Sequence, residues 1–199
     1  YFASSSAVYG FNENRLHEDI GPLMPISNYG AMKLSSEALI SASLESFLDK
    51  VCIYRFPNVV GVPATHGVIL DFIKKLKKDI STLEVLGNGL QEKSYMEVGD
   101  CVHAIIHVIK NTDLPLNCYN LASGDTCSVS RIAEIVVEES GLDNVSISYT
   151  GGDRGWAGDV PKAMLGVDLL NSLNFSANYN SEDAVRHTAA CLARELELI

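Results

Sequence analysis

Short runs rich in β-branched and aromatic residues alternate with amphipathic stretches along the whole chain. This alternation constrains the fold more than any other feature. Strands are predicted at residues 1–6 (YFASSS), 51–61 (VCIYRFPNVVG) and 118–123 (CYNLAS), with helical patterns between them. Strands that alternate with helices are typical of α/β proteins, in which the strands run parallel. A mostly parallel α/β sheet is therefore predicted.

Helices are predicted where apolar residues recur with a period of about 3.6 residues. The predicted helices lie at residues 28–48, 68–78, 99–110, 129–140, 167–173 and 181–196, and two further short strands at 83–87 and 145–150. Ser128 is a candidate N-cap and Gly141 a candidate end for the fourth helix. An apolar face of the first helix is marked by Ala31, Leu34, Ala38, Leu39, Ala42 and Leu44.

The charge and the cysteine content limit the possible partners. A formal net charge of −10 and a pI of about 4.9 disfavour nonspecific binding to nucleic acid or anionic membranes, since the overall field repels both. The five cysteines form no C-x-x-C pair, and we expect reduced thiols in a cytoplasmic protein. No apolar run approaches the roughly 18 residues of a membrane span. His103 and His107 have a metal-compatible spacing without an evident third ligand, so no metal site is expected.

The stretch SNYGAMKLSSE at residues 27–37 places Tyr29 four residues before Lys33 at the start of a predicted helix. This spacing puts both side chains on one helix face. A free phenol has a pKa of about 10, and a cation within about 4–6 Å lowers such a value by about 1–3 units, towards the range useful for proton transfer. Tyr29 is therefore a candidate acid/base group, with Gly30 and Ala31 leaving room for a flat ligand. In isolation, the same spacing is more often an ordinary surface pair.

Six stretches in a fixed order carry a resemblance to a known family. They are SSSAVYG, YGAMK, YRFPNVVG, GNGLQEKSYMEVGDCV, YNLASG and GWAGDVP, and they extend over essentially the whole chain. In this order the chain resembles the extended short-chain dehydrogenase/reductases that act on nucleotide sugars. Among these it is most similar to UDP-glucose 4-epimerases of the archaeal type. The motifs are specific for the family and much less specific for the sugar.

The resemblance implies a Rossmann-type, NAD(P)-binding parallel sheet, here partial because its N-terminal strands are absent, with a smaller α/β substrate-binding lobe. Residues 1–62 and 98–124 are expected to form the C-terminal part of the Rossmann-type domain. Residues 63–97 and 125–199 are expected to form the substrate-binding lobe, so that the two are interleaved along the chain.

The same resemblance implies the catalytic residues. Ser5 would assist at the reacting hydroxyl, Tyr29 would act as the base, and Lys33 would tune Tyr29 and also bind the nicotinamide ribose. Phe56 would lie near the nicotinamide. The implied reaction is NAD-dependent epimerisation of a UDP-sugar, UDP-glucose to UDP-galactose, through a 4-keto intermediate.

Two residues argue against the dehydration that some relatives perform. In those relatives the first motif resembles S-T-D-E-V-Y-G, and the carboxylates of its Asp and Glu serve to eliminate water. Here Ser6 and Ala7 occupy the two positions, which leaves no acid for the leaving hydroxyl. Hydride transfer without dehydration is the reaction that remains.

Residues for the nucleotide part follow from the resemblance as well. Lys93 stands where many relatives have an arginine for the diphosphate, and it would act as a point charge. Relatives often have a second arginine at the position of Trp156, so Arg154 is the substitute candidate. Asp159 is available for a ribose hydroxyl. Trp156 could stack on the base or fill the lobe.

Two further residues are implied to contact the sugar nucleotide. Asn58 in FPNVVG matches a substrate-contacting asparagine, although a turn residue after Pro57 is the alternative. Ile69, near the start of the helix at 68–78, is the second.

The phosphate-binding glycine fingerprint of the family, G-x-x-G-x-x-G after a first strand, does not occur in these residues. Together with the start at Tyr1 inside a predicted strand, this leads us to expect an N-terminal truncation. Two hypotheses follow. The chain is the C-terminal part of an epimerase that forms a homodimer when complete, or it is a noncatalytic module that binds sugar nucleotides. Another nucleotide-sugar oxidoreductase of the extended family remains a further alternative.

Overall fold

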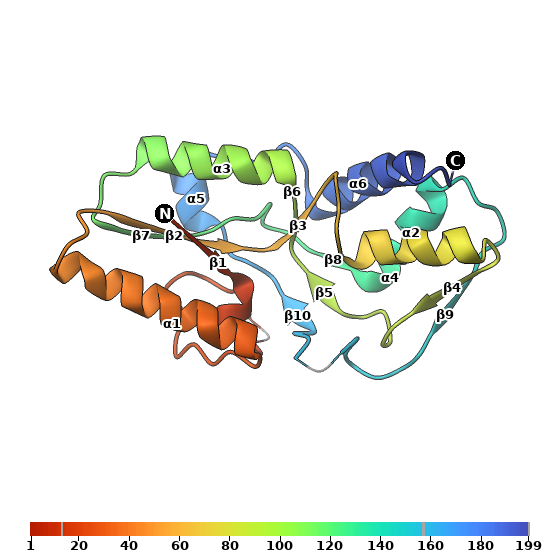
Figure 1. The fold of residues 1–199 in the computed structure, drawn as a ribbon, viewed down its shortest axis with the longest axis horizontal. Helices are drawn as coiled ribbons and strands as arrows, with labels where there is room; N and C mark the ends of the chain where they lie inside the picture. Colours follow the sequence, from red (N-terminus) through yellow and green to blue (C-terminus); the bar gives the residue numbers. More distant parts are fainter. Residues whose placement is uncertain (13, 157, 199) are drawn as a thin grey trace.

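Two groups of helices and strands lie side by side along the long axis of the molecule (Figure 1). The structure is a computed structural model that describes residues 1–12, 14–156 and 158–198. Glu13 and Ala157, which belong to two of the predicted loops, and the terminal Ile199 are outside the described residues.

The first group is built on a three-stranded parallel sheet. Its strands are β1 (Phe2–Ser5), β2 (Val51–Phe56) and β7 (Leu116–Asn120), in the order β1-β2-β7. Ser5 is opposite Phe56, and Arg55 is opposite Asn120, so all three strands end at one edge of the sheet. The predicted α/β class with parallel strands is confirmed.

Helices α1 (Asn28–Ala42) and α3 (Val98–Asn111) cover opposite faces of this sheet, and the short α5 (Asp168–Ser172) contacts β7 (Figure 1). Buried residues from the strands and α3 form the core with the 3₁₀ helix η1 (Ser6–Tyr9). A second 3₁₀ turn, η2 (Ser43–Glu45), follows α1, so the helix predicted to reach residue 48 is shorter than expected.

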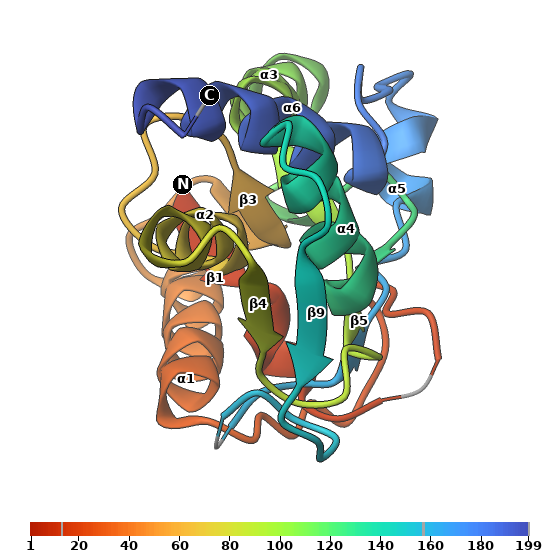
Figure 2. The ribbon, with the colours of Figure 1, turned by 90° about the vertical axis from the view of Figure 1, so that its right-hand side faces the viewer.

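The second group contains α2 (Val68–Lys78), α4 (Val129–Glu139) and α6 (Ser181–Glu195). These helices pack together over the parallel pair β4 (Thr82–Val85) and β9 (Ser146–Tyr149), which lie next to each other in Figure 2. Ser128 caps α4 by accepting a hydrogen bond from Arg131 N at 3.2 Å, as predicted from the sequence.

Short strands connect the two groups. β3 (Asn58–Val60) pairs with β6 (Tyr95–Glu97), and β5 (Glu92–Lys93) lies between β10 (Lys162–Ala163) and β8 (Cys127–Ser128). The core of the first group also includes four residues from the segment 125–199, which was expected in the substrate-binding lobe: Ala163, Leu165, Val167 and Leu170. The exact domain boundaries stay a prediction.

The apolar face of α1 is largely open to solvent. Leu39 and Ala42, from the predicted apolar face, are exposed, whereas Gly30 and Glu37 are buried. The burial of Glu37 was not predicted, and its carboxylate is paired with Arg55.

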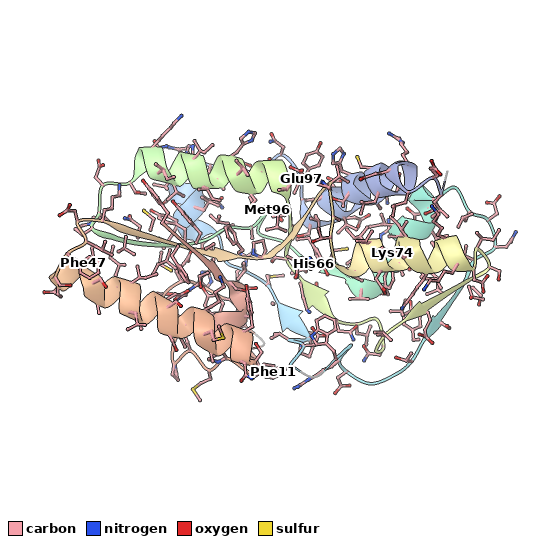
Figure 3. The ribbon with its side chains drawn as sticks, in the orientation of Figure 1. Phe11, Phe47, His66, Lys74, Met96 and Glu97 are labelled. Atoms are coloured by element: carbon pink, nitrogen blue, oxygen red, sulfur yellow. The ribbon has the colours of Figure 1, made fainter. Side chains whose placement is uncertain are left out.

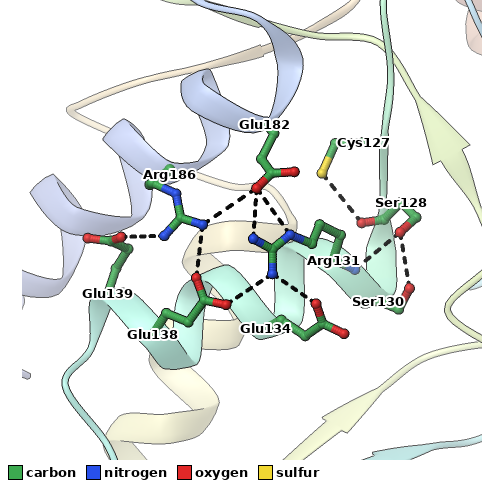
Figure 4. Close-up of polar contacts among 9 residues, drawn as sticks. All are labelled: Cys127, Ser128, Ser130, Arg131, Glu134, Glu138, Glu139, Glu182 and Arg186. Atoms are coloured by element: carbon green, nitrogen blue, oxygen red, sulfur yellow. Dashed lines mark hydrogen bonds and ion pairs between the residues drawn. The ribbon is translucent and has the colours of Figure 1, made fainter.

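Two arginines join α4 to α6 at the surface. Arg131 on α4 pairs with Glu182 on α6 at 2.7 Å, and Arg186 on α6 pairs with Glu139 at 2.7 Å (Figure 4). Glu134 and Glu138 complete the network. Such a network aligns the two helices, because each guanidinium binds carboxylates from both.

Candidate active site

A pocket of about 1000 Å³ opens between the two groups of elements. It starts at the carboxyl end of β1 and extends to the first turn of α2, and His66, one of its lining residues, lies near the middle of the molecule (Figure 3). Ligands of α/β proteins bind at the carboxyl ends of parallel strands, where loops leave a crevice. Six of the predicted site residues line this pocket: Ser5, Tyr29, Asn58, Ile69, Lys93 and Asp159.

Ser5 is the last residue of β1 and lies at the end of the pocket nearest the sheet. Its Oγ accepts a hydrogen bond from Ala7 N at 3.2 Å and so caps η1. The hydroxyl proton remains available to a ligand, because this contact uses only an oxygen lone pair.

Tyr29 and Lys33 lie on α1, which Ser27 caps through a 3.1 Å hydrogen bond from Gly30 N. The Tyr29 side chain is 55% exposed and lines the pocket. Lys33 Nζ lies 5.7 Å from the centroid of the Tyr29 ring and donates a 2.6 Å hydrogen bond to the Ala3 carbonyl. A cation is therefore fixed beside the phenol by the backbone of β1.

Gly30 has a packing role that the sequence did not predict. A Cβ at this position would lie 2.5 Å from the Ala7 carbonyl oxygen and 2.9 Å from Pro25 Cβ. The glycine lets α1 approach η1 closely, and Ala31 beside it is exposed. Gly30 therefore serves the packing of α1 against η1, and room for a flat ligand beside Ala31 stays a prediction.

A second tyrosine near the sheet can be excluded as a base. Tyr9 is buried, donates to Asn120 Oδ1 at 2.7 Å and accepts from Arg55 Nη1 at 2.9 Å. Burial raises the pKa of Tyr9 to about 12, although Arg55 acts in the opposite direction. The Tyr9 hydroxyl is thus buried and occupied by two hydrogen bonds, whereas Tyr29 is exposed and lines the pocket.

Lys93 and Asp159 form an ion pair inside the pocket, with side chains 14% and 2% exposed. Asp159 Oδ2 also accepts a 3.1 Å hydrogen bond from Gly155 N, and Lys93 Nζ lies 5.1 Å from the centroid of the Trp156 ring. Trp156 is 63% exposed and lines the pocket, so it does not fill the interior of the lobe. A ligand anion that binds Lys93 must share it with Asp159.

Three predicted site residues lie outside the set that lines the pocket. Lys33 is held against β1, and Phe56 packs partly buried against the core of the first group. Arg154 is exposed on the loop that precedes Gly155. Asn58 lines the pocket as the first residue of β3, and its backbone N donates to Ser94 O at 3.1 Å, so it is a strand residue.

Among the described residues, no group of three or more His, Cys, Asp or Glu side chains could hold a metal ion. His107 instead contacts the Leu173 carbonyl through Nε2 at 2.8 Å. No helix in the part of the chain that the structure describes is both long and apolar enough to span a membrane.

The comparison with protein families decides what kind of chain this is. The model of the NAD dependent epimerase/dehydratase family matches residues 1–122, which include β1, α1 and most of the residues lining the pocket. The chain belongs to the NAD dependent epimerase/dehydratase family. The resemblance to extended short-chain dehydrogenase/reductases that act on nucleotide sugars is thereby confirmed.

Individual members of the family extend the comparison. YtcB of Bacillus subtilis (strain 168), described as an uncharacterized UDP-glucose epimerase, is 29% identical over 140 residues, which are 70% of this chain and 44% of YtcB. A crystal structure of a UDP-galactose 4-epimerase superposes with a TM-score of 0.87 at 36% identity, over 98% of this chain and 63% of that one. The structure of MoeE5 in complex with UDP-glucose and NAD superposes with a TM-score of 0.83 at 28% identity, over 98% of this chain and 64% of that one. The chain thus spans less than two thirds of each.

Sequence reasoning missed one residue of the pocket. Gln91 is buried and lines the pocket, two residues before Lys93 and directly before β5. The first turn of α2, which contains the expected residue Ile69, also lines the pocket, and its N-cap, Gly67, makes no side-chain capping bond. Free backbone N–H groups at a helix N-terminus attract anions. The position of Gln91 two residues before Lys93 is the one signal that could have pointed to it.

Proposed function

We propose that this chain carries the catalytic and substrate-binding residues of an NAD-dependent nucleotide-sugar epimerase, with UDP-glucose and UDP-galactose as the substrate pair. One observation carries the proposal. Ser5 and Tyr29 line the same pocket as Lys93 and Asp159, so groups suited to proton transfer and groups suited to a nucleotide share one continuous space. Family membership and the similarity to UDP-galactose 4-epimerase support it.

The described residues fit one end of the cofactor. The Lys33 ammonium and the Tyr29 phenol lie beside β1, close to the edge where β1, β2 and β7 end, and they would hold the nicotinamide and its ribose. Phe56 at the end of β2 would contact the nicotinamide. In the part of the chain that the structure describes, no glycine-rich turn joins a strand to a helix, so this part offers no such site for the pyrophosphate. When bound, NAD supplies the acceptor and donor of a hydride.

The proton steps belong to three residues of the chain. Tyr29, with the Lys33 ammonium beside its ring, would remove the proton from the sugar hydroxyl at carbon 4 while that carbon is oxidised to a ketone. Ser5 donates a hydrogen bond to the reacting oxygen. The ketone then presents its other face, and Tyr29 returns the proton when the carbon is reduced. The net result is inversion at carbon 4.

The nucleotide is held further along the pocket. Lys93 and the N–H groups of the first turn of α2, including Ile69, face the pocket and would bind the diphosphate. Asp159 would exchange its contact with Lys93 for a ribose hydroxyl. Asn58, at the start of β3, would contact the sugar. Arg154 would need a movement of its loop to reach the diphosphate.

Dehydration is disfavoured as the reaction of this site. Ser6 and Ala7 begin η1 directly after Ser5, where an acid for the departing hydroxyl would be needed. In the noncatalytic alternative, the chain makes the same contacts to the nucleotide and Tyr29 has no role in proton transfer.

We further propose a homodimer that uses the exposed apolar residues Met32 and Leu39 of α1, and a cytoplasmic location consistent with five free cysteines.

The test is an assay of the protein with NAD and, in turn, UDP-glucose, UDP-galactose and their N-acetyl forms. Interconversion of at least one pair at carbon 4 is expected. Binding of UDP-sugars without turnover of any of them would favour the noncatalytic module, and release of a 4-keto-6-deoxy sugar would indicate a dehydratase.

A further inference from the structure

Gln91 lines the pocket with a side chain that is 2% exposed. Both its amide atoms, Nε2 and Oε1, are buried, and neither has a hydrogen-bond partner among the described residues. The backbone around it is satisfied, since Gln91 O accepts from Val129 N at 2.9 Å and Glu92 N donates to Pro161 O at 2.7 Å. The unsatisfied group is the side-chain amide alone.

An amide in this state is unfavourable for folding. Burial removes it from water, and without a partner the cost of desolvation is not recovered. A methionine or leucine would fill the same space without that cost. Buried polar groups without partners in native proteins call for an explanation, and a ligand that completes their hydrogen bonds is one.

The surroundings of Gln91 are built to accommodate this amide. Gly87, with φ +84°, lies so close that a Cβ there would be 2.0 Å from Gln91 Nε2. Gly87 is itself fixed, because its N donates to Thr150 Oγ1 and its carbonyl accepts from Gly151 N, each at 2.9 Å. Any residue larger than glycine at position 87 would collide with the amide.

The position along the pocket indicates which part of a ligand reaches Gln91. Gln91 directly precedes β5, two residues before Lys93, and both line the pocket; its amide lies against Gly87, which follows β4 of the second group. Ser5 and Tyr29 lie in the other group of elements, on α1 and β1. A nucleotide sugar with its sugar at Tyr29 and its diphosphate at Lys93 would extend its nucleoside towards the second group, where Gln91 lines the pocket.

We propose that Gln91 is a specificity-determining residue whose amide reads the nucleobase of the nucleotide sugar. The amide offers one donor and one acceptor side by side, which match the N–H and C=O of an imide edge such as that of uracil. Because both amide atoms are buried, the side chain would have to rotate about its own bonds to meet a base in the pocket that it lines. The inference rests on the proposed function and assigns the base-recognition role within that site.

The experiment compares UDP binding by the protein and by Gln91→Met, which has a similar length and no hydrogen-bonding amide. Isothermal titration calorimetry with UDP is expected to show a loss of about tenfold in affinity, as two neutral hydrogen bonds disappear. The melting temperature without ligand is expected to stay unchanged or rise. Gln91→Glu, which offers acceptors only, is also expected to bind UDP more weakly. Leu90→Met, at the exposed neighbouring position, should change neither property.

A second probe separates the base from the ribose. UDP methylated at uracil N3 lacks the imide proton, so the protein should bind it about as weakly as Gln91→Met binds UDP, and Gln91→Met should not distinguish the two ligands. Equal affinity of the protein and Gln91→Met for UDP overturns the role of Gln91 and leaves the proposed function standing. A discrimination against 2′-deoxy-UDP that depends on Gln91, without discrimination against the methylated base, also overturns it. No binding of UDP by the unmodified protein overturns both proposals.

Discussion

Arg55 and Glu37 form an ion pair in the interior, between β2 and α1. Arg55 Nη2 lies 2.8 Å from Glu37 Oε2, Arg55 Nε donates to Glu37 Oε1 at 3.1 Å, and each side chain is 6% exposed. Ser4 Oγ also donates to Glu37, and Arg55 Nη1 donates to the Glu18 carbonyl at 3.1 Å. Since Glu37 lies one turn after Lys33, the pair holds the helix that carries the candidate base against the sheet.

Removing one member of this pair should be strongly destabilising. Arg55→Met leaves the Glu37 carboxylate buried and without its cation, and the free energy of unfolding is expected to fall by about 3–5 kcal/mol. The double variant Arg55→Met/Glu37→Leu should recover much of the loss. Denaturant titration measures the free energy of unfolding of the single and the double variant. Lys75→Met, which breaks the exposed pair between Lys75 and Asp71, is the control and should cost less than about 1 kcal/mol.

Tyr29→Phe removes one hydroxyl from an exposed ring and should leave the fold intact. Loss of the proposed base should lower kcat by about 10²–10⁴-fold, while UDP affinity stays within about twofold of that of the unmodified protein. Initial rates with UDP-galactose and calorimetry with UDP give the two values. Tyr149→Phe, in an exposed tyrosine of β9, is the matched control. Full activity in Tyr29→Phe would remove Tyr29 from the mechanism.

Much of the fold follows from local patterns. The strand at 51–56, the helix at 68–78 and the cap at Ser128 were predictable, because periodicity, β-branched runs and capping residues act over a few neighbouring positions. The resemblance of the motifs also brought Ser5, Tyr29, Lys93 and Asp159 into one site, and they line one pocket.

The parts that the sequence did not predict depend on contacts between distant residues. Glu37 is buried because Arg55, eighteen positions away, and Ser4 satisfy its carboxylate. Lys93 is paired with Asp159 across a separation of 66 residues. The unsatisfied amide of Gln91 could not be foreseen either, since burial of a polar side chain is decided by the packing of several elements.

Glu18 should make the stability of the protein depend on acid pH. Burial raises the pKa of Glu18 above its ordinary value of 4.5, despite the hydrogen bond from Asn120 N at 2.8 Å. The folded chain thus holds this proton more tightly than the unfolded chain does. The contribution of Glu18 is most favourable below the unfolded pKa, and it is lost as the pH rises through the folded pKa.

Glu18→Gln tests this sign. The amide keeps an acceptor for Asn120 N and carries no charge, so the variant should melt at a higher temperature than the unmodified protein at pH 7. The difference should shrink as the pH falls below about 4, where the carboxyl is protonated in both states. Asp19→Asn, at an exposed neighbouring acid, is the control. A difference that grows towards acid pH would contradict the prediction.

The cysteines should differ in their reactivity. Burial raises the pKa of the Cys101 and Cys127 thiols to about 12, so at pH 8 only a fraction on the order of 10⁻⁴ is thiolate, the reactive form. Cys191 on α6 is partly exposed. Brief treatment with iodoacetamide, followed by peptide mass spectrometry, should find Cys191 labelled well before the other two. In urea, all should react at similar rates.

Gly30→Ala separates the two interpretations of the glycine beside Tyr29. In most helix positions this change stabilises by about 1 kcal/mol, because alanine is the better helix former. Here the new Cβ would lie 2.5 Å from the Ala7 carbonyl oxygen, so α1 must move away from η1. We expect the free energy of unfolding to fall by about 1–3 kcal/mol. Activity should also fall, because Tyr29 moves relative to Ser5.

Gly21→Ala is the control. A Cβ at Gly21 meets no atom within 4 Å, so this variant should change stability by less than about 1 kcal/mol. If Gly30→Ala kept its stability and lost only ligand affinity, the glycine would serve the ligand rather than the packing of α1.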